Sequence, residues 1–199
     1  MNISIIGTGY VGLVSGACFA KIGHKVICVD IDRNKVEKIN NSISPIFEKG
    51  LEEILKKYKD NICATTSYKE AIEKSDITFI CVGTPSEKNG EINLKYVDDA
   101  AEEIAIHLKN KKDFHSVVVK STVVPGTTEK HIIPILEKKS GKKAGTDFGI
   151  GMNPEFLREG VAVDDFLKPD RIVNGYLDEK TRKMLYELYK DFKAEIYET

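Results

Sequence analysis

The chain has 199 residues and a formal net charge of −1, so it lacks the basic excess that favours nucleic acid or an anionic membrane. Apolar residues make up 41% and charged residues 31%, which is typical of a soluble globular protein with a buried core. No apolar run has the length of a membrane span, and the N-terminus lacks the basic region of a signal peptide.

Short apolar runs alternate with longer segments of helical periodicity. The runs predicted to be strands are residues 3–7, 25–30, 61–66, 76–83, 115–122, 147–154, 170–176 and 194–198. The segments predicted to be helices are residues 10–23, 32–40, 51–58, 67–75, 94–109, 128–140 and 179–192. Pro134 lies inside one of these helices, so we expect a kink there.

This alternation predicts a Rossmann-type α/β fold, a doubly wound and mainly parallel sheet with helices on both faces. No repeat or low-complexity linker divides the chain, so we expect one domain over residues 1–199. The four cysteines, Cys18, Cys28, Cys63 and Cys81, lie in apolar stretches without metal-type spacing. We expect them to be buried thiols in a reducing, cytoplasmic compartment, with no metal bound.

A glycine fingerprint follows the first predicted strand and opens the first predicted helix. Gly7-Thr8-Gly9-Tyr10-Val11-Gly12 has the spacing G-x-G-x-x-G. Gly7 permits a tight turn, Gly9 lets the backbone approach a pyrophosphate, and Gly12 lets the helix pack closely on the sheet. The residues at the start of the helix, Tyr10 and Val11, lie where free N–H groups would bind the phosphates.

Asp30 ends the second predicted strand, 18 residues after Gly12. At this place a carboxylate accepts hydrogen bonds from the adenosine ribose and repels a 2′-phosphate, which favours NAD over NADP. The cations Arg33 and Lys35 lie nearby and weaken that preference. The alternative is that Asp30 only caps the next helix.

Two further groups follow strands of the predicted sheet. Gly83-Thr84-Pro85 follows the fourth strand, and Ser121-Thr122 ends the fifth. Ligands of doubly wound sheets bind beyond the carboxyl ends of strands, so these hydroxyl groups are candidates for cofactor or substrate contacts. They are equally typical of turn and cap residues, and both interpretations stay open.

Four segments together resemble the UDP-glucose/GDP-mannose dehydrogenase family. They are GTGYVGLVSGACFA, CVGTPSEKNGEINL, KSTVVPGTT and NPEFLREGVAVDDFLKPDRIVNG. The last segment is the most specific, and it is more similar to UDP-glucose dehydrogenases than to the GDP-mannose or N-acetylmannosamine branches. The resemblance implies oxidation of the C6 alcohol of a UDP-sugar to a carboxylate with two NAD.

The resemblance also implies residue roles. The residues matching NAD contacts are Asp30, Lys35, Thr84, Thr122 and Glu159. The residues matching the wall of the UDP-sugar site are Glu155, Phe156, Leu157 and Arg158. Thr122, Glu155 and Glu159 match the catalytic group that assists proton transfer and holds water. If residues 155–159 form a helical turn, Glu155 and Glu159 share one face and Arg158 lies within reach of Glu155.

The family's nucleophilic cysteine lies in a Cys-Phe-Pro-Lys-Asp context, and its catalytic lysine and asparagine lie on a long central helix. None of these motifs occurs here. We therefore expect a cofactor domain without the dimerisation helix and the C-terminal sugar-binding domain, inactive alone, whose full-length form is a homodimer. The alternatives are a domain of a GDP-mannose or UDP-N-acetylmannosamine dehydrogenase, and a non-catalytic NAD-binding module.

Overall fold

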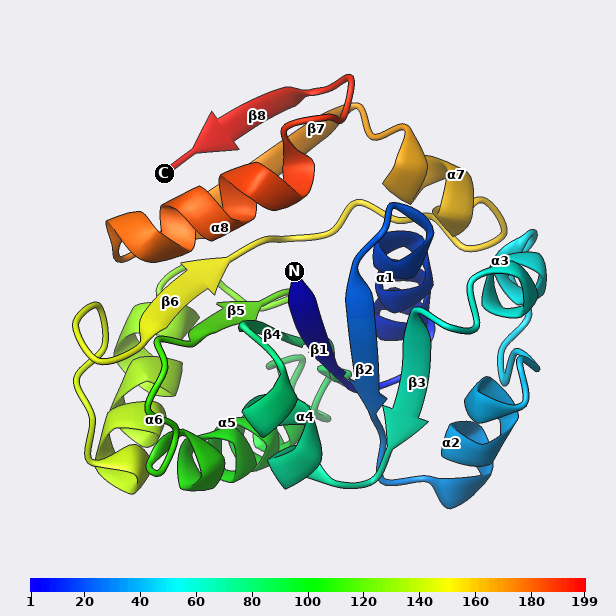
Figure 1. Ribbon diagram of the computed structural model, residues 1–199. Coiled ribbons are helices and arrows are strands. Elements are labelled where there is room, and N and C mark those ends of the chain that lie inside the picture. The colour runs from blue at the N-terminus through cyan, green and yellow to red at the C-terminus, as the bar shows by residue number, and fades with distance from the viewer.

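The computed structural model describes residues 1–199, and an eight-stranded sheet forms its centre (Figure 1). The strands are β1 (Asn2–Ile6), β2 (Lys25–Val29), β3 (Ile62–Thr65), β4 (Ile77–Ile80), β5 (Ser116–Val119), β6 (Gly149–Met152), β7 (Arg171–Tyr176) and β8 (Glu195–Glu198). Their spatial order is β3-β2-β1-β4-β5-β6-β7-β8. Only β6 and β7 pair antiparallel, which confirms the mainly parallel, doubly wound sheet.

Helices cover both faces of the sheet, as the alternation predicts. The helices are α1 (Tyr10–Lys21), α2 (Arg33–Asn40), α3 (Leu51–Lys57), α4 (Tyr68–Lys74), α5 (Lys95–Leu108), α6 (Ile133–Ser140), α7 (Ala162–Leu167) and α8 (Glu179–Tyr189). One apolar cluster joins α1, α3, α7 and α8 to the sheet, and another joins α4, α5 and α6 to its opposite face. None of the helices is both long and apolar enough to cross a membrane.

Two helical segments differ from the prediction. Helix α7 was not predicted, because its six residues are too few for a clear periodic pattern. The expected helix 128–140 divides into a π-helical turn, η1 (Thr128–Ile132), and α6, with Pro134 in the first turn of α6. Proline has no N–H for an intrahelical bond and crowds the preceding turn, which accounts for the wider turn before it.

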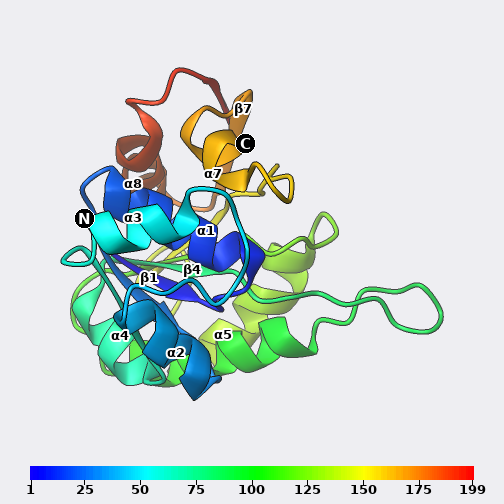
Figure 2. The ribbon, with the colours of Figure 1, turned by 90° about the vertical axis from the view of Figure 1, so that its right-hand side faces the viewer.

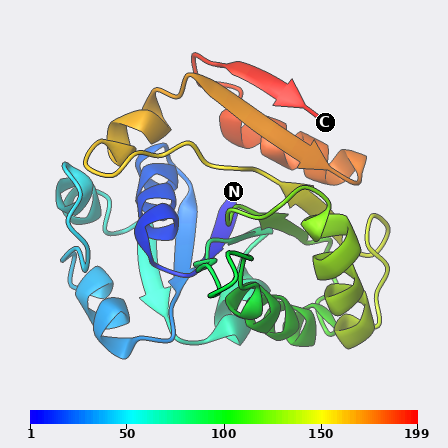
Figure 3. The same cartoon turned by 180° about the vertical axis from the view of Figure 1, so that it is seen from behind.

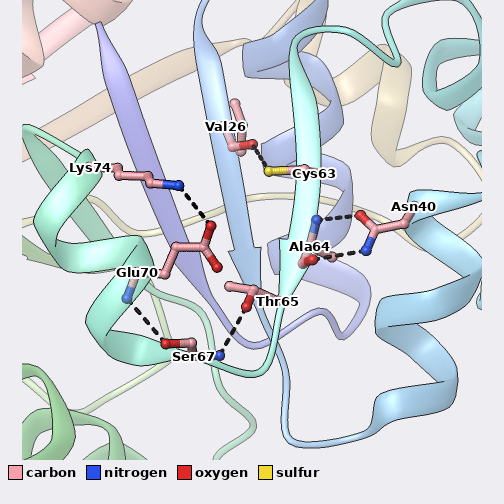
Figure 4. A network of polar contacts seen from close by, with 8 residues as sticks. All are labelled: Val26, Asn40, Cys63, Ala64, Thr65, Ser67, Glu70 and Lys74. Carbon is pink, nitrogen blue, oxygen red and sulfur yellow. Dashed lines mark hydrogen bonds and ion pairs between the residues drawn. The ribbon is translucent and has the colours of Figure 1, made fainter.

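The outer edge of β3 is closed by a side chain. Asn40, at the end of α2, accepts a hydrogen bond from the Ala64 N–H (2.7 Å) and donates one to the Ala64 carbonyl (2.9 Å), as Figure 4 shows. The amide thereby replaces a further strand at this edge. Cys63 lies on the same edge strand and is exposed, whereas the other three cysteines are buried, so its expected burial is wrong.

The end of the sheet opposite β3 is formed by β7, α8 and β8, which we call the β7–α8–β8 unit. Figure 3 shows α8 beneath these two strands. Only Gly151 and Met152 of β6 pair with β7. Beyond them the chain leaves the sheet and runs across the molecule to α7 (Figure 1). The connection from β4 to α5 extends away from the body of the molecule, with an isolated bridge between Ser86 and Ile92 (Figure 2).

Candidate dinucleotide and substrate site

The glycine loop between β1 and α1 is packed backbone against backbone. Gly7 has φ +94°, and a Cβ on it would lie 2.8 Å from the Cys81 carbonyl oxygen. A Cβ on Gly12 would lie 1.9 Å from the Gly7 carbonyl oxygen, so the helix could not approach the loop. Gly9 has no heavy atom within 4 Å of its Cβ position. The loop is therefore tight at Gly7 and Gly12 and open at Gly9, the position expected to face a pyrophosphate.

The start of α1 suits an anion. Gly9 is its N-cap and supplies no side-chain hydrogen bond, and the first turn holds no acidic residue. The first N–H groups of a helix have no partner within the helix, and its dipole is positive at that end. The amides of Tyr10, Val11 and Gly12 lie at this position, so the chain fits a dinucleotide phosphate here.

Asp30 follows β2 and faces the glycine loop. One carboxylate oxygen accepts hydrogen bonds from the N–H (2.9 Å) and the hydroxyl of Thr8, and the other accepts one from the Asp32 N–H (3.0 Å). Burial raises the pKa of Asp30, but these bonds and the Lys35 ammonium at 3.6 Å outweigh it, so the pKa is lowered. Asp32, not Asp30, caps α2 by accepting from the Asn34 N–H, so the alternative role of Asp30 as the cap is wrong.

The hydroxyl groups beyond β4 and β5 bond to the protein. Thr84 Oγ1 donates to the Thr122 carbonyl (2.9 Å), and Ser121 Oγ donates to the Val82 carbonyl (2.7 Å). They link the ends of two neighbouring strands beside the glycine loop, which agrees with their interpretation as turn residues. Their lone pairs, and the open space at the Gly83 Cβ position, leave the prediction of cofactor contacts standing.

The segment between β6 and α7 has no helical turn at residues 155–159, so the condition under which Glu155 and Glu159 would share one helix face is not met. Instead, carboxylates bind its amides. Glu155 Oε2 accepts from the Leu157 N–H (2.6 Å), and Asp165 accepts from the N–H and the guanidinium of Arg158. Arg158 therefore pairs with Asp165 and not with Glu155. Because side chains satisfy these donors, the segment gains nothing from helical bonds.

A distant carboxylate completes this arrangement. Glu48, on the loop between α2 and α3, is 6% exposed and accepts from the N–H groups of Gly160 (2.9 Å) and Ala162 (3.0 Å). It thereby fixes the turn after Glu159 and the start of α7. Sequence reasoning missed Glu48, because a contact over more than a hundred residues leaves no local pattern.

Phe156 and Leu157 form the apolar part of the segment. Phe156 is half exposed, and its ring centroid lies 4.2 Å from the Arg171 guanidinium carbon. Leu157 packs on the larger apolar cluster. Beneath residues 155–158 lies a cavity of about 180 Å³, also lined by Lys120, Asn153 and Tyr189.

Lys120, Asn153 and Tyr189 were not predicted as site residues. All three are buried, and the Asn153 side-chain oxygen accepts from the Lys120 ammonium (2.8 Å) and the Tyr189 hydroxyl (2.7 Å). Burial lowers the pKa of Lys120 to about 8. A signal was present, because Lys120 directly follows the continuously buried run Ser116–Val119 of a parallel strand, where a charged residue is unusual.

The fold and the glycine loop together define a dinucleotide-binding domain of the dehydrogenase type. A family model described as "UDP-glucose/GDP-mannose dehydrogenase family, NAD binding domain" matches residues 1–193. The chain therefore belongs to this family, and its cofactor is NAD. The predicted resemblance and cofactor are confirmed.

Two curated relatives differ in the substrate that they name. GDP-mannose 6-dehydrogenase of Pseudomonas aeruginosa is 47% identical over 198 residues, covering 98% of this chain and 45% of the relative. UDP-glucose 6-dehydrogenase of Haloferax volcanii is 47% identical over 190 residues, covering 95% of this chain and 44% of the relative. The chain thus spans less than half the length of these relatives.

Solved structures show the same fold. A ternary complex of GDP-mannose dehydrogenase from Pseudomonas aeruginosa superposes with a TM-score of 0.98 at 46% identity, covering 100% of this chain and 46% of that one. A UDP-glucose dehydrogenase from Pyrobaculum islandicum superposes with a TM-score of 0.94 at 40% identity, with the same coverage. These superpositions establish the fold, and the roles of the individual site residues stay predictions.

Proposed function

We propose that this chain is the NAD-binding part of a nucleotide-sugar 6-dehydrogenase. The observation that carries the proposal is the segment Asn153–Gly160. It holds Glu155 and Glu159 beyond the carboxyl end of β6, and the glycine loop and Asp30 follow the carboxyl ends of the parallel strands β1 and β2. Bound NAD would accept a hydride in each of two oxidations. The alcohol R–CH₂OH, one water and two NAD⁺ then give R–COO⁻, two NADH and three protons.

In this proposal, Glu155 accepts the protons that the alcohol oxygen and the attacking water release. Its Oε2 is held by the Leu157 N–H, which fixes the carboxylate and leaves Oε1 without a protein donor. Thr122, three residues beyond the end of the neighbouring strand β5, holds the water that the second step consumes. Glu159 contacts the cofactor, and Phe156, Leu157 and Arg158 line the sugar nucleotide.

We propose that none of the cysteines in this chain is the thiol that captures the intermediate aldehyde. Burial raises the pKa of the Cys18 and Cys81 thiols to about 12 and raises that of Cys28 as well, which disfavours the reactive thiolate. We propose that the nucleophile, a central dimerisation helix and a sugar-binding domain belong to a longer, cytoplasmic, homodimeric enzyme. The 199 residues alone are then inactive.

Two nucleotide sugars are candidates. The resemblance of the segment Phe156–Val173 to UDP-glucose dehydrogenases favours UDP-glucose as the substrate. The superposition on the GDP-mannose dehydrogenase complex, with a TM-score of 0.98, favours GDP-mannose. We propose GDP-mannose or UDP-glucose as the substrate of the complete enzyme, with the base recognised outside these residues.

Calorimetric titration of the purified chain with NAD, NADP, GDP-mannose and UDP-glucose tests the proposal. We expect NAD to bind, NADP to bind more weakly, and the sugar nucleotides to bind weakly without NADH formation. Asp30→Ala should weaken NAD binding by about 1–3 kcal/mol, because it removes charge-assisted hydrogen bonds to the ribose.

Asp32→Asn is the matched control, because it removes a neighbouring carboxylate charge and keeps an acceptor for the α2 cap. It should bind NAD as the wild type does. Formation of two NADH per sugar nucleotide by the isolated chain would show that the nucleophile lies within it, because the second oxidation requires the captured aldehyde. Failure of the wild type to bind NAD would contradict the proposed function.

A further inference from the structure

A lysine is buried directly beneath the segment that carries Glu155. Lys120 is 4% exposed and follows the last residue of β5. Its Nζ donates to Asn153 Oδ1 (2.8 Å) and lies 3.5 Å from the Asn153 backbone oxygen. The centroid of the Phe166 ring lies 6.0 Å from Nζ. None of these partners is a carboxylate.

Stability does not explain this lysine. Burying an ammonium group without an ionic partner costs several kcal/mol, and apolar replacements of buried charges are often neutral or stabilising. Met has nearly the same length and would fill the same space without that cost. A buried cation next to a candidate site therefore points to a role in the site.

Asn153 connects this cation to the segment. Its Oδ1 accepts from both Lys120 and Tyr189, and its Nδ2 donates to the Val173 carbonyl (2.9 Å) and to Asn174 Oδ1 (3.0 Å). The side chain thus uses all four of its hydrogen-bonding positions. Asn153 is also the residue where the chain leaves β6, so its position sets where Pro154 and Glu155 begin.

A cavity lies next to these bonds, between them and residues 155–158. Its volume is about 180 Å³, and Lys120, Asn153 and Tyr189 form one side of it. A segment without regular secondary structure above a cavity can settle inward unless polar contacts hold its start. The bond from Lys120 to Asn153 supplies such a contact on the side nearest to β5.

We propose that Lys120 is a positioning residue of the dehydrogenase reaction, which acts through Asn153 to hold residues 155–159 at the cofactor. This inference rests on the proposed function. The ammonium donates a stronger hydrogen bond than a neutral amine does, so the hold weakens when Lys120 loses its charge.

The groups around Lys120 make this effect visible in a pH titration. Burial lowers the pKa of Lys120 to about 8, whereas burial raises the pKa of Cys81 on the β4 side to about 12 and also raises that of Tyr189 on α8. Glu155 is the acidic group of the segment that acts on Lys120. The same cavity is lined by Arg158 and Asp165, which pair with each other, by Lys168, Asp170 and Arg171, and by the uncharged ring of Phe166. Lys120 is therefore the group here that changes charge near pH 8.

The test uses the whole chain with three variants, Lys120→Met, Lys120→Arg and Tyr189→Phe. Amide NMR signals of Leu157 and Arg158 are followed across this pH range, and NAD affinity is measured at the same pH values. In the wild type we expect the signals to shift with a midpoint near pH 8. NAD affinity should fall by about tenfold over the same range, the scale of losing one charge-assisted bond.

Lys120→Met should show no midpoint and should bind NAD weakly at every pH. Lys120→Arg should keep the low-pH signals and affinity throughout, because arginine stays charged. Tyr189→Phe removes the other bond to the same Asn153 oxygen without changing a charge, so it should keep the midpoint.

A midpoint near pH 8 that persists in Lys120→Met would overturn the inference, whether or not the chain binds NAD. If Lys120→Met does not fold, the titration of Lys120→Arg tests the inference instead. A midpoint near pH 8 that persists in Lys120→Arg would also overturn it. A wild type that shows the Lys120-dependent midpoint but binds no NAD would count against the proposed function and not against the hold on residues 155–159.

Discussion

At the scale of single residues, the glycines of the first loop are required for different physical reasons. Gly12 is needed for packing, because its Cβ would meet the Gly7 carbonyl oxygen at 1.9 Å. Gly9 has φ −70°, which any residue adopts, and open space around it. The protein itself therefore does not require glycine at position 9, whereas a ligand that approaches the backbone does.

This difference can be measured with two matched substitutions. Gly12→Ala should lower the free energy of unfolding by about 1–3 kcal/mol or more, the usual cost of overpacking, because two backbone segments must move apart. Gly9→Ala should unfold like the wild type but lose most of its NAD affinity. Thermal unfolding and calorimetry separate the two effects, and equal loss of stability in both variants would contradict the assignment.

At the scale of elements, a polar chain links β1, β4 and the start of β5 inside the core. The Ser4 and Thr78 hydroxyls lie 2.6 Å apart, and Thr78 Oγ1 lies 2.7 Å from His115 Nε2. The other ring nitrogen of His115 lies 3.1 Å from the Ser75 carbonyl oxygen. Burial and the nearby Lys111 lower the pKa of His115 from 6.5 to about 3, so the ring is neutral in the folded protein.

This histidine should make stability depend on pH. Between pH 6.5 and about 3 the unfolded chain binds a proton that the folded chain does not. The stabilisation is therefore complete above pH 6.5 and falls as the pH decreases, by at most about 1.4 kcal/mol per pH unit. Denaturant unfolding should show His115→Gln with a shallower acid slope than the wild type, and His107→Gln on α5 with the wild-type slope. A shallower slope in His107→Gln alone would disprove this.

The order of elements was predictable from the sequence, because apolar runs and helical periodicity are local properties. The glycine loop and Asp30 were predictable for the same reason, since they occupy fixed places beside β1 and β2. The direction of β7 was not, because the alternation of apolar and polar residues along a strand is the same in either direction. The shape of residues 155–161 depends on Glu48 and Asp165, whose contacts no spacing rule indicates.

At the scale of the whole molecule, the β7–α8–β8 unit is joined to the rest in two different ways. In β6, only Gly151 and Met152 pair with strand β7, and the Ile150 carbonyl accepts one further bond from the Leu177 N–H (3.0 Å). The side chains of the unit enter the larger core through α8, where the Tyr189 ring lies 5.9 Å from the Phe19 ring of α1 and Leu188 is 3% exposed. The attachment therefore depends on packing more than on the sheet.

Leu188→Ala should consequently release this unit before the rest of the sheet opens. Such truncations cost about 2–5 kcal/mol, and hydrogen exchange should accelerate in β7 and β8 while β1 and β4 keep wild-type rates. Ile104→Ala, a comparable truncation on α5 in the other apolar cluster, should accelerate the central strands as well. Uniform acceleration in Leu188→Ala would show that the molecule opens as one unit.

The contacts of Asp30 have a thermodynamic consequence. A carboxylate offers about four acceptor positions, and here the Thr8 N–H, the Thr8 hydroxyl and the Asp32 N–H already take three of them. In the proposed NAD complex, a ribose diol would bring two donors to one free acceptor position, and the Thr8 hydroxyl is the bound donor that can rotate away. Cofactor binding at this carboxylate would then be partly an exchange of one hydroxyl for another, and we expect its enthalpy to be small. Its selectivity comes from the charge that the exchange leaves in place.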